Sequence, residues 1–197
     1  MLASLLTFTQ TAGYPLLFAL IVAESGGVPV PGETALITAA ALAGQGKLSI
    51  AVVIPVAAGA AIIGDNLGFL LARRFGRGLL ERPGPFFGQR RRALEVGEPF
   101  FARHGPKAVF FGRWILGLRT WTAWLAGASK MNWRAFAVWN AAGGVSWAAT
   151  VGLTAYFLGQ STAGLFIVFG LVGLGAAVFV AGILLARGRR VRRAAQS

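Results

Sequence analysis

The stretch AVFFGRWILGLRTWTAWLAG, residues 108–127, places two arginines, Arg113 and Arg119, among side chains that are almost all apolar. An earlier stretch, GGVPVPGETALITAAALAG, residues 26–44, is also apolar and carries Glu33. An ionisable side chain at membrane depth costs about 2.5–3.5 kcal/mol on insertion scales, so such residues are usually functional. Two apolar segments of opposite charge therefore predict a functional site inside a membrane protein.

The composition is typical of a polytopic membrane protein. The 197 residues are 56% hydrophobic, include 28 glycines and have a mean hydropathy of +0.66. The formal net charge is +13. Such a charge suggests nucleic acid in a soluble protein, but beside long apolar runs it fits anionic lipid headgroups better. We expect anionic membrane lipids, and not nucleic acid, as partners.

Cysteine is absent and His104 is the single histidine. Disulfides, thiol catalysis and Cys-based metal sites are excluded, and one histidine cannot build a His-rich metal site. We expect no metal and no cofactor. The beginning of the chain lacks the basic region of a secretory signal, so no removable signal peptide is expected.

Apolar runs that reach the roughly 20 residues needed to cross a bilayer occur at residues 52–72, 135–158 and 164–186. Residues 14–23 are apolar but short. They either form a fourth span with help from the preceding turn or lie partly in the interface. The fold class is therefore an all-α integral membrane protein with three to four transmembrane helices.

Residues 26–46 and 107–130 differ from these spans because glycine or proline interrupts them. Non-helical backbone at membrane depth is tolerated only where protein or a watery cavity surrounds it. We expect both segments to be re-entrant helical hairpins, which enter and leave the membrane on the same side.

The two halves of the chain resemble each other. LAGQGKLS (42–49) corresponds to LAGASKMN (125–132), and in both halves a hairpin precedes this motif and a long helix follows it. Only residues 52–72 cross between the hairpins, so the second hairpin must enter from the opposite face. This predicts an inverted-topology repeat with a transport site near the midplane. Within one membrane domain over 1–197, the predicted units are a half-repeat over about 24–76, a basic loop over 73–107, a half-repeat over about 107–159, the span 164–186 and a basic tail over 187–197.

The basic residues orient this topology. Residues 73–107 hold nine of them, Lys130 and Arg134 follow the second hairpin, and residues 187–197 hold five. All sixteen fall on one face, whereas the other face keeps only Lys47. By the positive-inside rule, the basic loop and the carboxyl-terminal tail are cytoplasmic.

Arg113 and Arg119 would lie on opposite faces of a continuous helix, but Gly117 between them allows them to converge. Arginine stays charged when buried, and its planar fork of donors suits phosphate. One interpretation is a phosphate-binding pair, and the other is a lock between the hairpins with Glu33 as the partner. Both hold if a gate exchanges the carboxylate for substrate.

Three acids can join this site. Glu24 and Glu33 flank the first turn of the first hairpin, and Asp65 lies in a predicted span. They either cap a broken helix and pair with arginine, or they relay protons, because desolvation raises the pKa of a carboxyl group. The other acids are expected to be surface partners in the basic loop: Glu81, Glu95 and Glu98.

The remaining residues of chemical interest have ordinary explanations. His104 is expected to be a capping or interfacial residue. The tryptophans are expected to serve interfaces and packing: Trp114, Trp121, Trp124, Trp133, Trp139 and Trp147.

Several motifs, in this order, resemble the DedA family, also called SNARE-associated or VTT-domain membrane proteins. They are ESGGVPVPGE (24–33), GDNLGFLLARRFG (64–76), FARHGPKAVFFGRWILGLRTWTAWLAGASKM (101–131) and FAVWNAAGGVSW (136–147). The resemblance runs from about Glu24 to Gly159. It implies two opposed re-entrant hairpins and the movement of lipids between leaflets, including undecaprenyl phosphate in bacteria and phospholipids in eukaryotic relatives.

The resemblance also implies which residues matter. The acids that the family needs match Glu24 and Glu33, and its two arginines match Arg113 and Arg119. Leu116 stands where the family usually has proline in the second turn, and Phe69 stands where it usually has tyrosine.

We therefore expect a translocase of a lipid phosphate, most specifically undecaprenyl phosphate, in the bacterial inner membrane. Protons or sodium are the coupling ions considered, and a homodimer is left open. The alternatives are a general phospholipid scramblase and a proton-coupled exporter of small cations. An enzyme is disfavoured, because no second histidine or cysteine is present to act as nucleophile or base.

Overall fold

The computed structural model describes residues 2–75, 88, 103–115, 118–161, 164, 167 and 170. Its elements are α1 (Leu2–Ser25), α2 (Gly32–Gly44), α3 (Ile50–Phe75), η1 (Gly105–Lys107), α6 (Ala108–Gly112), α7 (Thr122–Ala128) and α8 (Trp133–Gly159). Throughout these ranges the regular structure is helical, which confirms the all-α class. Most of the predicted loop 73–107, the predicted span 164–186 and the tail 187–197 lie outside the described residues.

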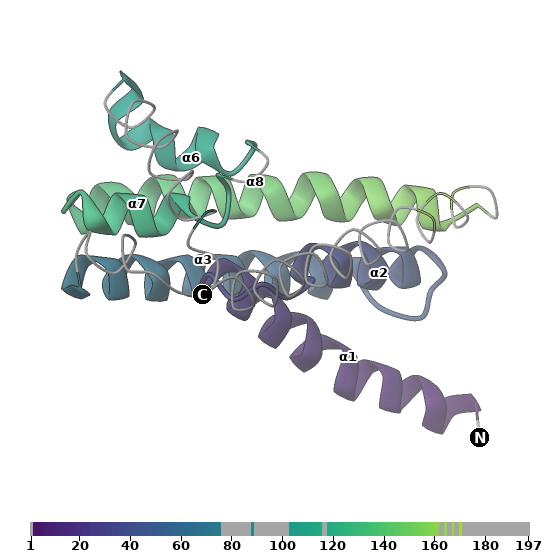
Figure 1. The fold of residues 1–197 in the computed structure, drawn as a ribbon. Helices are drawn as coiled ribbons and strands as arrows, with labels where there is room; N and C mark the ends of the chain where they lie inside the picture. The colour runs from purple at the N-terminus through teal and green to yellow at the C-terminus, as the bar shows by residue number, and fades with distance from the viewer. Residues whose placement is uncertain are drawn as a thin grey trace, which may run out of the picture.

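The long helices α3 and α8 form the centre of the fold (Figure 1). Each is long and apolar enough to cross a membrane, and they contain the predicted spans 52–72 and 135–158. They run antiparallel: Arg73 Nη1, near the end of α3, donates to the Met131 carbonyl just before α8 at 2.7 Å. Asn132 starts α8, because its side chain accepts hydrogen bonds from the first backbone amides of the helix.

The segment predicted as the first re-entrant hairpin does not contain two helical arms of its own. Residues 26–46 contain a turn and one helix, α2, and the arm that precedes the turn is the end of α1. The breakers explain the difference, because Gly27, at φ 97°, and the prolines at positions 29 and 31 all belong to the turn. Residues 14–23 lie within the continuous helix α1 and therefore supply this arm.

The second predicted hairpin, residues 107–130, contains two short helices, α6 and α7, on either side of a bend. Leu116 and Gly117, on which the sequence argument for the turn depended, lie outside the described residues. Figure 1 shows α6 and α7 beside the start of α8, on the opposite end of the bundle from the end of α2.

Each short helix packs on the long helix of the other half: α2 on α8, and α7 on α3. A Cβ atom at Gly44 would lie 2.3 Å from the Tyr156 carbonyl oxygen, and one at Gly127 would lie 2.3 Å from the Phe69 carbonyl oxygen. Small residues allow such close approach of helix backbones. The two motifs that suggested the repeat therefore make the same kind of contact in both halves.

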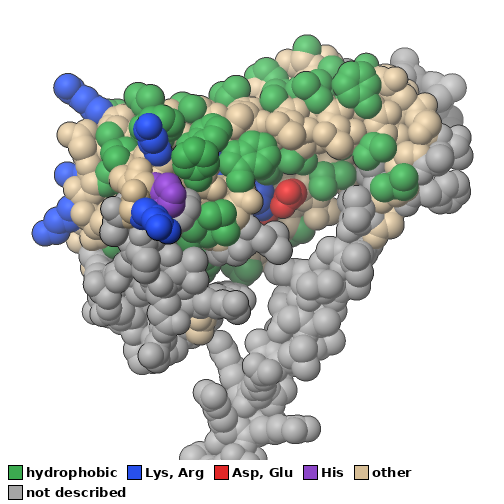
Figure 2. Space-filling view, turned by 90° about the horizontal axis from the view of Figure 1, so that it is seen from above, with side chains coloured by type: hydrophobic (Ala, Val, Ile, Leu, Met, Phe, Trp, Pro, Cys, Tyr) green, Lys and Arg blue, Asp and Glu red, His purple; other side chains and the backbone are tan. Residues whose placement is uncertain are grey.

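The outer surface is largely apolar. Figure 2 shows hydrophobic side chains across one face, with Lys and Arg side chains gathered at one end. Large exposed hydrophobic residues include Leu67, Val138 and Phe157, which are 48%, 67% and 64% exposed. An exposed apolar patch of this kind fits contact with lipid.

Candidate functional site

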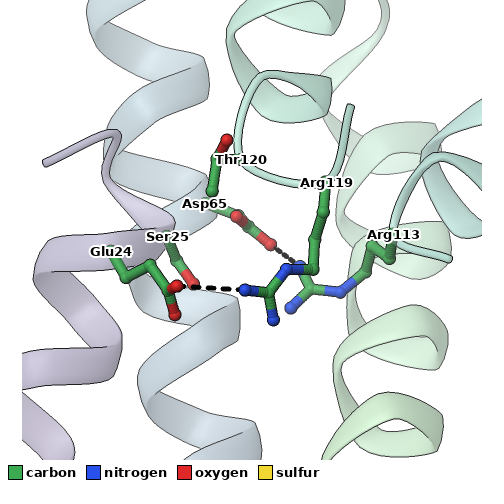
Figure 3. Close-up of a pocket in the computed structure, with 6 residues that line it drawn as sticks. All are labelled: Glu24, Ser25, Asp65, Arg113, Arg119 and Thr120. Atoms are coloured by element: carbon green, nitrogen blue, oxygen red, sulfur yellow. Dashed lines mark hydrogen bonds and ion pairs between the residues drawn. The ribbon is translucent and has the colours of Figure 1, made fainter. Parts of the chain in front are cut away.

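The five residues predicted to form a site come together between two bends of the chain, the turn between α1 and α2 and the bend between α6 and α7. Figure 3 shows four of them, Glu24, Asp65, Arg113 and Arg119. Glu24 lies at the end of α1, Glu33 in the first turn of α2 and Asp65 within α3. Arg113 directly follows α6, and Arg119 lies in the bend before α7. The chain therefore assembles three carboxylates and two guanidinium groups from separate elements.

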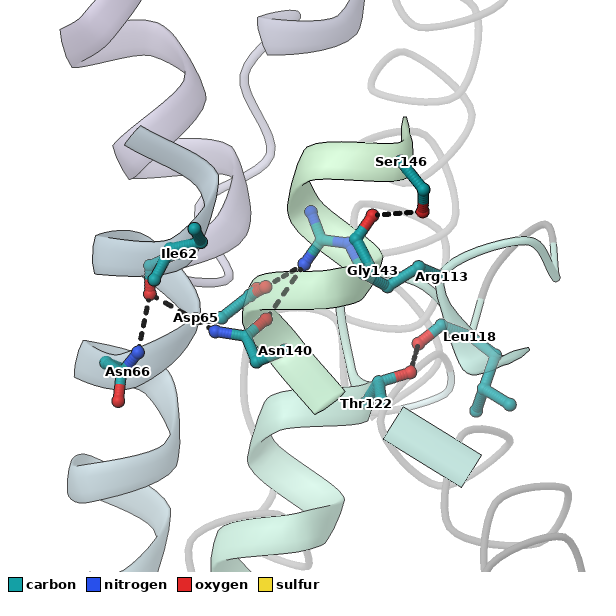
Figure 4. A network of polar contacts seen from close by, with 9 residues as sticks. All are labelled: Ile62, Asp65, Asn66, Arg113, Leu118, Thr122, Asn140, Gly143 and Ser146. Carbon is teal, nitrogen blue, oxygen red and sulfur yellow. Dashed lines mark hydrogen bonds and ion pairs between the residues drawn. The ribbon is translucent and has the colours of Figure 1, made fainter. Parts of the chain in front are cut away.

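Arg113 and Asp65 form a buried ion pair. The two residues are 5% and 3% exposed. Arg113 Nη1 donates to Asp65 Oδ2, and also to Asn140 Oδ1 at 3.2 Å. Asn140 Nδ2 in turn donates to the Ile62 carbonyl at 3.3 Å (Figure 4). Arg113 is therefore tied to α3 directly and through α8.

One hydrogen-bond donor of the Arg113 side chain lacks an acceptor among the described residues. Its Nε atom is buried and has no hydrogen-bond partner among the residues that the structure describes. Buried polar groups are nearly always satisfied, so an exception calls for an explanation. Arg113 is also one of the residues that line the small pocket described below.

Arg119 is more accessible and joins the two bends. Its Nη2 atom lies 3.0 Å from Glu24 Oε1 and 3.0 Å from Glu33 Oε2. The side chains of Arg119, Glu24 and Glu33 are 18%, 15% and 42% exposed. The predicted contact between Arg119 and Glu33 is thus present, and Glu24 shares the same nitrogen.

The residues around this cluster form a small pocket. Its empty space is about 200 Å³ when the open mouth is included. It is lined by Glu24, Ser25, Asp65, Arg113, Arg119 and Thr120. Within the described part of the chain, no group of three or more His, Cys, Asp and Glu side chains could hold a metal ion.

Trp124 joins the two bends at a second point. Its Nε1 atom donates to the Gly26 carbonyl at 3.2 Å. A Cβ atom at either Gly27 or Gly68 would lie 2.8 Å from that nitrogen. The indole therefore fills a space that glycine keeps open on both the first turn and α3.

Sequence reasoning missed the contribution of α8. From the sequence, Trp147 was expected to serve interfaces and packing. In the structure it is 3% exposed, and both Arg113 and Arg119 lie over its ring. Asn140 was not singled out. A signal existed, because Asn140, Gly143 and Trp147 follow the spacing i, i+3, i+7 of one helical face, and a Cβ atom at Gly143 would lie 2.6 Å from Arg113 Cδ.

Comparison with protein families matches residues 30–160 to the VTT domain. This chain is a VTT-domain membrane protein. It is 35% identical over 159 residues to an uncharacterized membrane protein of Synechocystis, a match that covers 81% of this chain and 73% of that protein. It is 36% identical over 157 residues to an uncharacterized membrane protein of Mycobacterium tuberculosis, covering 75% and 70%.

The resemblance to the DedA family is also confirmed. The protein DedA of Escherichia coli is 30% identical over 151 residues, covering 74% of this chain and 68% of DedA. No solved structure matches the chain significantly. The matched range contains Glu33, Asp65, Arg113 and Arg119, and Glu24 lies outside it, six residues before its start (30 − 24).

Proposed function

We propose that this VTT-domain protein moves a lipid phosphate, undecaprenyl phosphate in the first instance, between the leaflets of the bacterial inner membrane. The observation that carries the proposal is the state of the two arginines. Arg113 is buried, and its Nε donor has no acceptor among the described residues. Arg119 forms ion pairs with Glu24 and Glu33, and both arginines line a partly open pocket.

The proposed membrane arrangement is an inverted repeat of two re-entrant bends. It is supported by the antiparallel α3 and α8 and by the matching contacts of Gly44 and Gly127. Ile50 and Trp133, which begin α3 and α8, are 83 residues apart (133 − 50), as are Gly44 and Gly127 (127 − 44). Bends that enter from opposite sides would place the pocket near the midplane, where transporters of this construction bind substrate.

The chemistry of the pocket suits a phosphate group. A phosphate oxygen can accept from Arg113 Nε, and other oxygens can replace Glu24 and Glu33 on Arg119. Arginine binds phosphate through two parallel charge-assisted hydrogen bonds, which gives both energy and geometry. No covalent step is required, so we propose transport without an enzymatic reaction.

The charges of the site residues suggest how a coupling ion takes part in transport. Three carboxylates, those of Glu24, Glu33 and Asp65, face two guanidinium groups. With every group ionised the cluster carries one negative charge, so one proton would neutralise it. We propose that Glu24 and Glu33 take up protons when phosphate displaces them from Arg119, with sodium as the alternative coupling ion.

The proposed orientation follows from the basic residues. Arg73 and Arg74 at the end of α3, and Lys130 and Arg134 around the start of α8, lie at one end of the bundle and are exposed. Lys47, between α2 and α3, lies at the other end. We propose that the first group faces the cytoplasm, where anionic lipids would be attracted to it.

The test is leaflet exchange in liposomes. Purified protein would be compared with Arg119→Ala, and with Arg74→Ala as a matched control at an exposed arginine. We expect exchange of labelled undecaprenyl phosphate by the wild type and the control, and none by Arg119→Ala. The proposal is wrong if the wild type exchanges no more lipid than empty vesicles. Equal exchange of ordinary phospholipids would favour a scramblase. Proton flux driven by small cations would favour an exporter.

A further inference from the structure

One buried indole lies beneath both arginines of the site. The guanidinium carbon of Arg113 lies 5.7 Å from the centre of the Trp147 ring, and that of Arg119 lies 5.0 Å from it. Both distances are within the range of a cation–π interaction. Two like charges repel each other, so a group that attracts both at once stabilises an arrangement that is otherwise unfavourable.

The two arginines depend on this ring to different degrees. Arg113 is also held by Asp65 and Asn140. Both carboxylate contacts of Arg119, from Glu24 and Glu33, are made by the same nitrogen, Nη2. If Glu24 and Glu33 move away, Arg119 therefore loses both ion pairs at once. Its contact with the Trp147 ring does not depend on either glutamate.

We propose that Trp147 is a positioning residue, which keeps Arg119 in the site while its acidic partners are exchanged for the anion that is carried. The role of Trp147 in transport rests on the proposed function; its hold on the two arginines does not. Because the indole attracts cations without binding them through hydrogen bonds, Arg119 can turn its donors from the glutamates to a new acceptor and stay over the ring.

The competing explanation is that Trp147 only fills space, since it also packs in the apolar cluster with Leu36 and Ala148. Fluorination of the indole distinguishes a cation–π role of Trp147 from a role in packing alone. Adding fluorine to an indole reduces the negative charge of its face with little change in shape, so it weakens a cation–π interaction and leaves packing almost unaltered.

Site-specific incorporation of mono-, di-, tri- and tetrafluorotryptophan at position 147 gives the test. In vesicles containing labelled undecaprenyl phosphate, we expect the logarithm of the exchange rate to fall steadily with each fluorine, by about tenfold across the series. The same series at Trp139 is the matched control, because its ring contacts Phe110 and no cation among the described residues, and the rate there is expected to change far less than at Trp147.

Thermal unfolding of the same proteins provides a readout that needs no transport. The unfolding midpoint is expected to fall along the series at Trp147 and to fall much less along the series at Trp139. If the wild type exchanges no lipid phosphate, the proposed function fails, but a falling midpoint at Trp147 would still support its hold on the arginines. A flat midpoint series overturns that hold, and a flat rate series in an active protein overturns the role in transport.

Discussion

Asp65→Asn tests the buried ion pair most directly. The substitution keeps the size of the side chain and removes its charge, so Arg113 is left charged where it is 5% exposed. Breaking a buried pair by removing one partner costs about 3–5 kcal/mol. This corresponds to a change of about a hundredfold or more in the unfolding equilibrium. Asn140 still accepts from Arg113, but a neutral amide does not compensate a buried charge.

The assay is reversible unfolding in mixed micelles, followed by the circular dichroism of the helices. Glu33→Gln is the matched control, because it also removes one charge from an arginine contact, but at a side chain that is 42% exposed. Exposed ion pairs contribute about 0.2–1 kcal/mol, so this variant is expected to unfold close to the wild type.

A double-mutant cycle completes the experiment. Combining Asp65→Asn with Arg113→Met removes the uncompensated charge, so the double variant is expected to be more stable than Asp65→Asn alone. Equal losses of unfolding free energy for Asp65→Asn and Glu33→Gln, or strictly additive losses in the double variant, would show that Arg113 and Asp65 do not form a stabilising buried pair.

Three further substitutions test the packing around the site. Gly127→Ala places a Cβ atom 2.3 Å from the Phe69 carbonyl oxygen and is expected to lower the free energy of unfolding by about 1–3 kcal/mol. Gly59→Ala, whose Cβ atom would meet nothing within 4 Å, is expected to be neutral or to stabilise by up to about 1 kcal/mol; equal losses for the two glycines would contradict the close helix contact. Asn140→Leu removes an acceptor of Arg113 and is expected to cost about 1–3 kcal/mol and to slow lipid-phosphate exchange, whereas exchange at the wild-type rate would show that Asn140 does not position Arg113.

The long helices could be predicted from the sequence, because few structures other than a helix can bury an apolar run of about 20 residues. The runs 52–72 and 135–158 lie inside α3 and α8 for this reason. The limits of the first bend could not be predicted as well. Glycine and proline show that the chain turns but not which neighbouring helix supplies the other arm, and here α1 supplies it.

The residues of the site, too, could be predicted only in part. The convergence of Arg113 and Arg119 was predictable from Gly117 between them, because a continuous helix would place the two residues on opposite faces and a break in the helix need not. Their neighbours on α8 were harder to predict than their carboxylate partners, since these neighbours depend on how α8 packs on α3. Asn140 and Trp147 become part of the site only because one face of α8 meets the second bend.

We propose above that phosphate competes with glutamate for Arg119, and the function depends on this competition. It is tested most directly by the dissociation constant of a short lipid phosphate, such as farnesyl phosphate, for the protein in nanodiscs. We predict that Glu33→Gln tightens binding by up to about fivefold, because an exposed ion pair no longer has to be broken. Arg119→Gln is predicted to abolish binding. Weaker binding by Glu33→Gln, or unchanged binding by Arg119→Gln, would contradict the account.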